Sequence, residues 1–380
     1  AEAIFRDARK YTVRIRTQIT TPFISDERGS FFAAGFLVDS TRRWVLTNAH
    51  VVGHSPSDVT MAFADGTFRP ARKVYVDSFT DVAVLEAPAD GRRHPTAPID
   101  CEHVPEVGEA VGAFGHPLGM TFTGTRGIVS GKTDQFLEDL LQIDATVDHG
   151  NSGGPVIALG DGRIVGIATA AVGGDKSDRL NFATPMKDVC RILELLRNGV
   201  PPDPPEMEFS FLIDEDDRHT LQVGATYNRA RWPFQPGDSV MSVGREREPV
   251  STVTQFVTAM RGRAGVVPIR VMRVGREVEI QARPMRRPSV IAQRGIIIDG
   301  ALVAQADFED LNALSEPARL VVQSVESGSS AEALGLHPLD LIQSVDDRRD
   351  DDLDSLLLYL RQHQSGTPLR LVFRHMSGES

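Results

Sequence analysis

Three side chains that together can carry out acyl transfer occur at well-separated positions in this chain. Ser152 lies in Gly150–Pro155, where flanking glycines allow a sharp turn that exposes a hydroxyl group. His50 lies in the apolar run Trp44–Val52, and Asp81 opens a strand-like segment. A serine hydroxyl is a weak nucleophile until a neighbouring base removes its proton, and a histidine oriented by an aspartate can serve as that base. The sequence therefore predicts a nucleophilic serine site assembled from three segments.

The segments around these residues resemble the HtrA (DegP-like) family of trypsin-fold serine proteases. The chain order His, Asp, Ser is that of the chymotrypsin class. The resemblance is good over residues 1–199 and looser beyond, and its motifs are Leu46–Val52, Thr80–Leu85 and Gly150–Pro155, with support from Gly127–Ser130 and Gln142–Ala145.

The resemblance implies a role for each residue of the site. Ser152 would be the nucleophile, His50 the general base, and Asp81 the group that holds the imidazole. The N–H groups of Gly150 and Ser152 would form the oxyanion hole, with Asn151 shaping the loop. No metal or organic cofactor is implied.

The same resemblance implies that the primary specificity pocket is lined by Val147, Ala170 and Ala171. These residues are apolar and not large, and no acidic residue lies at the pocket base, which argues against cleavage after Lys or Arg. We expect cleavage after small or medium aliphatic residues. The alternative is that Val147 and Ala170 are ordinary core residues.

Two further histidines lie close to these motifs. His149 stands where the family usually has Pro or Arg, and Asp148 replaces an Asn. We interpret His149 as a variable loop residue, with a substrate contact or pH sensitivity as the alternative. His116 is expected to shape a turn.

The overall composition excludes some partners. With 380 residues and 41% hydrophobic residues, two or three globular domains are expected. The formal net charge of −11 argues against a nucleic-acid surface, and no apolar run approaches the ~20 residues that span a bilayer. The chain starts Ala1-Glu2-Ala3 without a signal peptide, which fits both a mature form left after cleavage and a trimmed chain.

The two cysteines, Cys101 and Cys190, belong to no CxxC motif or Cys/His cluster, which argues against a metal site. They are either two small buried thiols, the interpretation we favour, or a disulfide. The cysteines therefore do not decide the redox compartment.

Short β-rich runs separated by turn residues predict a mainly β fold between residues 11 and 170. The resemblance sharpens this to a chymotrypsin-like double β-barrel, two six-stranded barrels with the site between them, over residues 1–199. A helix is expected over 184–198, capped by Thr184, with a buried stripe of Val189, Ile192, Leu193 and Leu196. The proline-rich residues 200–206 would be a semi-rigid linker.

The remainder contains a degenerate internal repeat of a turn, a helix and a strand. The turn 236–243 is echoed by 338–345, the helix 253–260 by 353–362, and the strand 267–273 by 367–374. Two copies of one fold are therefore expected. We call residues 207–285 the first copy and residues 288–378 the second copy. Both resemble PDZ domains, α+β modules that accompany HtrA proteases.

A PDZ-like domain captures a peptide carboxylate at a glycine-containing loop. In the second copy, Gly295 with Ile296, Ile297 and Ile298 would form that loop. The first copy has no glycine in 208–213, which puts peptide binding there in doubt. Leu339 also replaces an expected glycine beside Asp340, and the acidic run 346–352 reads as a solvated loop.

Together these features predict an ATP-independent serine endopeptidase that degrades unfolded or damaged proteins in protein quality control. The alternative is a chaperone or adaptor whose PDZ-like domains hold clients while proteolysis is idle or tightly regulated. The family forms homotrimers or higher oligomers, often through an N-terminal aromatic residue, for which Phe5 and Tyr11 are candidates. The expected compartment is the bacterial periplasm, with a eukaryotic organelle as the alternative.

Overall fold

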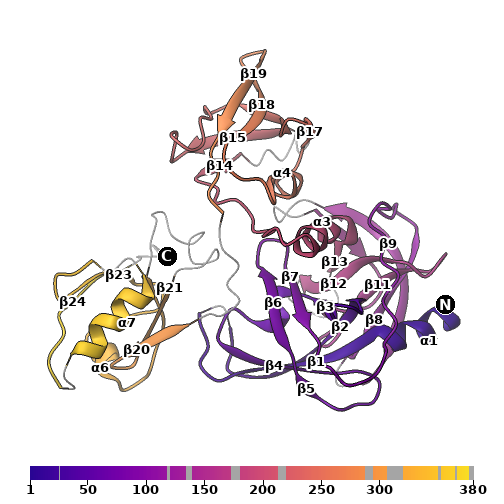
Figure 1. Ribbon diagram of the computed structural model, residues 1–380, viewed down its shortest axis with the longest axis horizontal. Helices are drawn as coiled ribbons and strands as arrows, with labels where there is room; N and C mark the ends of the chain where they lie inside the picture. Colours follow the sequence, from indigo (N-terminus) through magenta and orange to yellow (C-terminus); the bar gives the residue numbers. More distant parts are fainter. Residues whose placement is uncertain are drawn as a thin grey trace. The chain divides into compact units, whose positions relative to one another are not determined.

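The computed structural model of the 380-residue chain is shown in Figure 1. It describes all residues except 25, 118–119, 134–138, 173–179, 213–219, 287–293, 306–319, 350–351, 364–365 and 376–380. Parts of the turn after His116, of the segment 208–213 and of the acidic run 346–352 therefore lie outside the described residues. The chain divides into two compact units, one of residues 1–15, 32–51 and 60–289, the other of residues 16–31, 52–59 and 290–380.

The N-terminal strands form one antiparallel sheet in the order β5-β4-β1-β2-β3-β7-β6. Six strands were expected here, and the seventh is the short β5, which pairs with β4. The strands are β1 (Thr12–Ile19), β2 (Gly29–Asp39), β3 (Trp44–Thr47), β4 (Ser57–Ala62), β5 (Arg69–Pro70), β6 (Arg72–Asp77) and β7 (Val82–Glu86), and the helices are α1 (Glu2–Tyr11) and α2 (Ala49–Val52).

The next six strands close into a barrel in the order β10-β13-β12-β11-β8-β9. Its interior is a cluster of small and branched apolar side chains that includes Val111, Val129, Leu141 and Val165. The strands are β8 (Ala110–Gly115), β9 (Thr123–Thr133), β10 (Leu140–Ile143), β11 (Pro155–Ala158), β12 (Ile164–Val172) and β13 (Leu180–Pro185). The predicted mainly β fold class is confirmed.

Helix α3 (Met186–Arg197) follows the barrel, and its first turn differs from the prediction. Thr184 is not a cap, because it lies in β13 and pairs with Ile167 of β12. The helix therefore begins two residues later than expected. Val189, Ile192 and Leu193 are buried as predicted, Leu195 is buried as well, and Leu196 is half-buried.

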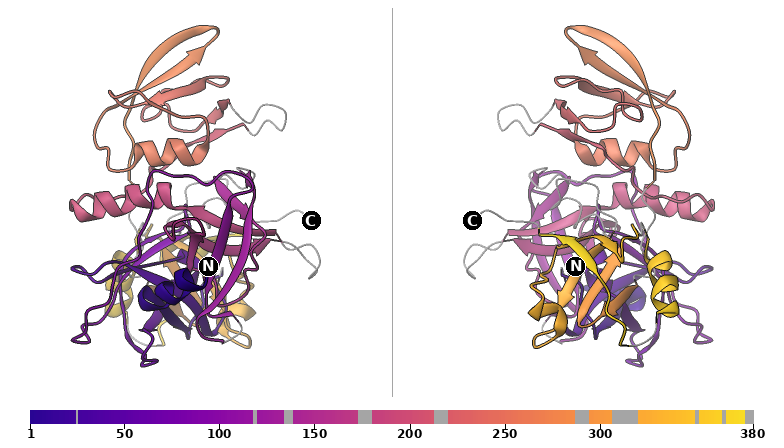
Figure 2. Two further views of the ribbon diagram at one scale, coloured as in Figure 1. Left: turned by 90° about the vertical axis from the view of Figure 1, so that its right-hand side faces the viewer. Right: turned by 90° about the vertical axis from the view of Figure 1, so that its left-hand side faces the viewer.

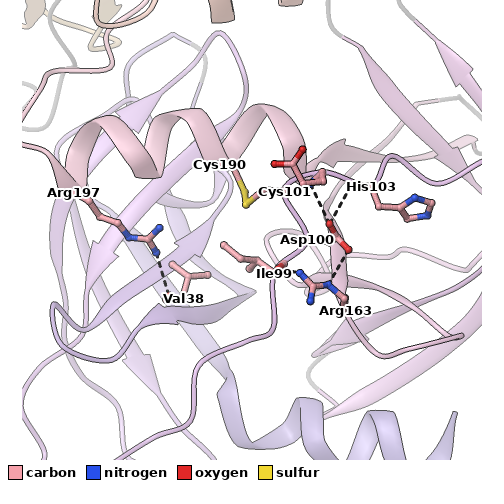
Figure 3. The surroundings of a disulfide bond; sticks show 9 residues. Val38, Ile99, Asp100, Cys101, His103, Arg163, Cys190 and Arg197 are labelled. Atoms are coloured by element: carbon pink, nitrogen blue, oxygen red, sulfur yellow. Dashed lines mark hydrogen bonds and ion pairs between the residues drawn. A yellow bond between two sulfur atoms is a disulfide. The ribbon is translucent and has the colours of Figure 1, made fainter.

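Cys101 and Cys190 form a disulfide bond, so the interpretation as two buried thiols was wrong. Figure 3 shows that the bond ties α3 to the segment that precedes β8. Beside it, Asp100 accepts a 2.8 Å hydrogen bond from Arg163 and two more from backbone N–H groups. The two cysteines are 89 positions apart in the sequence, and closing a loop of this length removes about 4–5 kcal/mol of unfolded-state entropy in the chain-entropy model.

Each copy of the predicted repeat forms a sheet. The first has the order β14-β15-β16-β18-β19 with β17 beside β16, and the second has the order β20-β21-β22-β23-β24. The strands are β14 (Phe209–Phe211), β15 (Leu221–Thr226), β16 (Ser239–Val243), β17 (Glu248–Pro249), β18 (Val267–Arg273), β19 (Arg276–Ala282), β20 (Gly295–Ile298), β21 (Ala301–Gln305), β22 (Leu320–Val325), β23 (Leu341–Val345) and β24 (Leu371–Arg374).

Helices α4 (Val253–Met260) in the first copy and α7 (Leu353–Gln362) in the second lie where the sequence predicted them. The second copy also has the short helix α6 (Ser330–Ala333), which was not predicted. Helix α7 lies along one side of its sheet in Figures 1 and 2, and its Leu353 and Leu356 join the core beneath it. No helix in the described part of the chain is long and apolar enough to cross a membrane.

The two aromatic residues considered for subunit contacts are both used within this chain. The ring of Phe5 stacks on Phe114, with 5.6 Å between centroids, and fills the space left by Gly112 and Gly124 of the barrel. Tyr11 is buried. Phe5 therefore packs on the barrel of its own chain and is half-buried there.

Candidate active site

Neighbouring strands of the first sheet bring His50 and Asp81 together. Strand β3 leads directly into α2, which carries His50, and it pairs with β7, which Asp81 precedes. Nδ1 of His50 lies 2.8 Å from Oδ2 of Asp81, and the His50 backbone N–H donates to Oδ1 at 2.9 Å. The carboxylate thus fixes both the imidazole and the start of its helix.

Two residues that the sequence did not indicate hold Asp81 in place. Asp81 has a φ of +48°, a left-handed conformation that non-glycine residues adopt only when their surroundings enforce it. The side chain of Asn48 donates to the Asp81 carbonyl at 2.9 Å, and Thr169 Oγ1 donates to Oδ2 at 2.8 Å. Thr169 stands immediately before the predicted pocket residues, but only the fold shows its partner.

The turn that leads to Asp81 is organised by Asp77, which was also missed. Its carboxylate accepts hydrogen bonds from the Phe79 N–H at 3.0 Å and the Thr80 hydroxyl at 2.9 Å. The guanidinium group of Arg261, at the end of α4, forms a fully buried ion pair with Asp77. Removing one member of such a pair leaves the other charge buried without a partner, which typically costs about 3–5 kcal/mol, so this turn is sensitive to changes at Arg261 of the first copy.

The electrostatics of the pair favour its charged form. Burial lowers the pKa of His50, but the charge and the hydrogen bond of Asp81 outweigh it and leave that pKa raised. Burial raises the pKa of Asp81, and the charge of His50 with hydrogen bonds from His50 and Thr169 lowers it overall. An imidazolium formed during proton transfer is therefore stabilised in place.

Ser152 lies on a turn held between the first sheet and the barrel. Its carbonyl accepts a 2.9 Å hydrogen bond from Ala34 of β2, and the next N–H, of Gly153, donates to Ala168 of β12 at 2.8 Å. Gly153 has a φ of +80°, and a Cβ there would collide with Thr47 Oγ1 and the Ala34 carbonyl. Only glycine fits, which accounts for the sequence pattern around the serine.

The predicted oxyanion-hole groups lie on the same turn. Gly150 has a φ of +103°, and its carbonyl accepts from the His116 N–H at 3.0 Å. Among the described residues, no hydrogen bond takes up the N–H of Gly150 or of Ser152. Asn151 is buried and closes the turn: its backbone N–H donates to the Asp148 carbonyl, and its own carbonyl accepts from the Gly154 N–H.

The nucleophile and the base are not bonded to each other. Within the part of the chain that the structure describes, no hydrogen bond joins Ser152 Oγ to the His50 imidazole. Catalytic hydrogen bonds are often long without substrate and tighten in the complex. The site thus has a formed His–Asp pair and a formed serine turn, with the Ser–His contact still to be made.

The other predicted site residues have separate surroundings. Val147 is buried in the apolar cluster of the barrel. Ala170 and Ala171 lie in β12, but their side chains lie outside the described residues. His149 is exposed, and His116 is buried, where burial and then the charge of Arg14 lower its pKa to about 4.

The predicted peptide-binding residues form an edge strand. Gly295 to Ile298 are β20, which pairs with β21 and with no other described strand. Ile296 and Ile298 pack toward the core while Ile297 is 64% exposed. In the first copy the corresponding strand is β14, whose Phe209 and Phe211 pack on aromatic side chains of the core.

Comparison with known proteins agrees with this geometry. Residues 33–167 match the family model of the trypsin-like peptidase domain. The serine endoprotease DegS of Escherichia coli K12 is 34% identical over 177 residues, 44% of this chain and 48% of that protein. A probable periplasmic DegP-like serine endoprotease of Chlamydia pneumoniae is 27% identical over 89% of this chain and 72% of its own length.

A solved structure gives the same fold. The HtrA-type protease AlgW with a tripeptide superposes with a TM-score of 0.59 at 23% identity, over 75% of this chain and 97% of its own. The chain spans about half the length of the DegS relatives that it matches. The motifs and these matches together show that the chain contains a trypsin-like peptidase domain and is similar to the DegS and DegP-like serine endoproteases, and the solved structure shows that it shares the fold of an HtrA-type protease.

Proposed function

We propose that this chain is an ATP-independent serine endopeptidase that hydrolyses peptide bonds of unfolded or damaged proteins in protein quality control. The observation that carries the proposal is the 2.8 Å contact of His50 with Asp81, together with the Ser152 turn held by Ala34 and Ala168. The endoprotease names of the relatives support it.

The residues divide the reaction between them. Ser152 Oγ attacks the peptide carbonyl while His50 accepts the hydroxyl proton, and Asp81 stabilises the resulting imidazolium. The N–H groups of Gly150 and Ser152 bind the oxyanion. As the C–N bond breaks, His50 returns the proton to the leaving amine. Water, activated by the same histidine, then hydrolyses the acyl-enzyme.

The missing Ser–His hydrogen bond bears on the alternative, a chaperone or adaptor with idle or regulated proteolysis. Because catalytic hydrogen bonds can tighten only in the substrate complex, the absence of this bond among the described residues is compatible with a resting enzyme as well as with an adaptor. Hydrolysis of denatured casein by the purified chain, inhibited by a serine-directed phosphonate that labels Ser152, tests the proposal. Casein binding with no hydrolysis and no label would favour the adaptor.

Cleavage should occur after Val, Ala, Ile or Leu. The expectation rests on the apolar residues Val147, Ala170 and Ala171 at the predicted pocket, which offer no charge to a basic side chain. Mass spectrometry of casein fragments gives the residue before each cut. Cuts mainly after Lys or Arg would show that the pocket is misassigned while leaving the triad untouched.

We further propose that the second copy captures peptides that end in an apolar residue. The edge of β20 that pairs with no other described strand offers backbone groups for strand addition, beside the exposed Ile297. The full chain carrying Ser152→Ala should bind such a peptide in calorimetry and bind its C-terminally amidated form much more weakly. Photo-crosslinks from the peptide should map to Gly295–Ile298, whereas crosslinks to Phe209–Phe211 would assign binding to the first copy.

The domain limits, assembly and location complete the proposal. We assign residues 1–199 to the protease domain, 200–206 to the linker, and 207–285 and 288–378 to the two PDZ-like domains. A homotrimer or larger homo-oligomer is what the HtrA resemblance implies. A location in the bacterial periplasm fits the named relatives, one of which is called periplasmic. A disulfide also fits an oxidising compartment.

A further inference from the structure

Two histidines and one aspartate meet at one end of the sheet in the second copy. Asp340 immediately precedes β23 and His375 immediately follows β24, and these strands pair with Leu341 opposite Arg374. His337 lies in the turn three residues before Asp340. The nearest ligand atoms of the three side chains all lie within 4.8 Å of one another.

The aspartate is the buried member of this cluster. It is 2% exposed, and its Oδ2 accepts the His337 backbone N–H at 2.8 Å while Oδ1 lies 2.9 Å from His375 Nδ1. The imidazoles face each other with 5.4 Å between ring centroids, and both histidines are exposed. A buried carboxylate stays charged at low cost only when hydrogen bonds or a neighbouring cation compensate its charge. A histidine is such a cation only in its protonated form.

In the first copy, the aspartate at the equivalent position is paired with an arginine. Asp238 is 1% exposed and accepts the Gln235 N–H at 2.8 Å, as Asp340 does from His337. Opposite it, Arg273 makes two hydrogen bonds to the carboxylate, at 2.8 and 2.7 Å. The fixed charge of that arginine neutralises the aspartate in a closed pair.

The second copy replaces both neighbours of this aspartate. By strand register, His375 takes the position that Arg273 has in the first copy. His337, three residues before Asp340, takes the position of Gln235, three residues before Asp238. The turn itself is kept, since Leu339 holds a φ of +70° where Gly237 has +88°. The copies therefore differ by the exchange of a built-in cation for two imidazoles that converge on the same carboxylate.

We propose that His337, Asp340 and His375 bind a divalent transition-metal ion of the zinc type. Two imidazole nitrogens and one carboxylate oxygen are a ligand set that zinc accepts, with a fourth position left for water or a client side chain. Tetrahedral zinc with bonds of about 2.0–2.1 Å needs ligand atoms about 3.3 Å apart. The ligand atoms now lie within 4.8 Å of one another, so the two exposed imidazoles would rotate to close this spacing around the metal while the buried aspartate keeps its place. The metal would then clamp the ends of β23 and β24.

The test uses the full chain carrying Ser152→Ala, which prevents self-digestion. Titration with zinc in metal-free buffer should show one equivalent bound, and Co²⁺ should give the visible absorption bands of a tetrahedral nitrogen–oxygen site. His375→Arg reproduces the first copy's Asp–Arg pair and should preserve folding while weakening this binding by about 10²-fold or more. His337→Gln, which copies Gln235, should also weaken it. His363→Gln changes another histidine of the same copy and should leave it unchanged.

Thermal unfolding provides a second readout. Zinc should raise the unfolding temperature of the parent chain and of His363→Gln, but not that of a folded His375→Arg. Absence of an equivalent of bound metal in the parent would overturn the proposal. The proposal would also be overturned if metal bound but neither His375→Arg nor His337→Gln weakened the binding, because the metal would then lie at other residues.

Discussion

Ser152→Ala should abolish hydrolysis of denatured casein while the chain stays folded. Loss of a triad nucleophile typically lowers turnover by about 10⁶-fold, because the remaining groups can bind and polarise the substrate but cannot form an acyl-enzyme. Alanine fits the turn, since the contacts that hold it involve the Ser152 carbonyl and the Gly153 N–H rather than the hydroxyl.

Circular dichroism and thermal unfolding of Ser152→Ala should match the parent chain. A suitable control is Ser130→Ala in β9, a serine remote from the turn, which should retain activity. Proteolysis by a contaminant-free preparation of Ser152→Ala at the parent rate would rule out Ser152 as the nucleophile.

Asp81→Asn should reduce turnover by about 10⁴-fold, the loss seen when a triad histidine is held in the wrong tautomer. The amide keeps the size of the side chain but loses the charge that faces His50 Nδ1 at 2.8 Å. Steady-state hydrolysis of a peptide substrate measures the effect. Thr169→Val removes one 2.8 Å hydrogen bond to the same oxygen and should cost at most about 10²-fold.

The pH dependence of Asp81→Asn gives an independent check. Activity falls on the acidic side when His50 is protonated and cannot act as a base. Asp81 raises the pKa of His50 against the lowering effect of burial, so removing its charge leaves burial in control. The acidic inflection of kcat/KM should therefore move to lower pH in the variant. An inflection at unchanged or higher pH, or turnover within tenfold of the parent, would contradict the proposed role.

Short-range signals account for what the sequence predicted well. The helices Val253–Met260 and Leu353–Gln362 were predicted with the observed limits, and each starts at a side-chain cap, Thr252 and Asp352. The start of α3 was predicted wrongly. Thr184 is a residue type that caps helices well, but here it belongs to β13 and pairs with Ile167 of β12.

The candidate site shows the same difference between residues marked by local sequence and residues brought in by long-range packing. His50, Asp81 and Ser152 are marked by the residues beside them, so their segments could be read from the chain. Thr169 meets Asp81 across 88 positions, and Arg261 reaches Asp77 from the first copy. No local pattern marks such partners, because packing alone selects them. The Cys101–Cys190 bond was misjudged for the same reason, at a separation of 89.

That disulfide also closes part of the chain into a covalent ring. Ser152 and Thr169 lie inside the ring of residues 101–190, whereas His50 and Asp81 lie outside it. The nucleophile and its base thus belong to topologically different parts of one polypeptide. A backbone nick within the ring, including one made by the enzyme itself, leaves the two fragments joined until the bond is reduced. A gel run without reductant therefore reports such a nicked chain as intact.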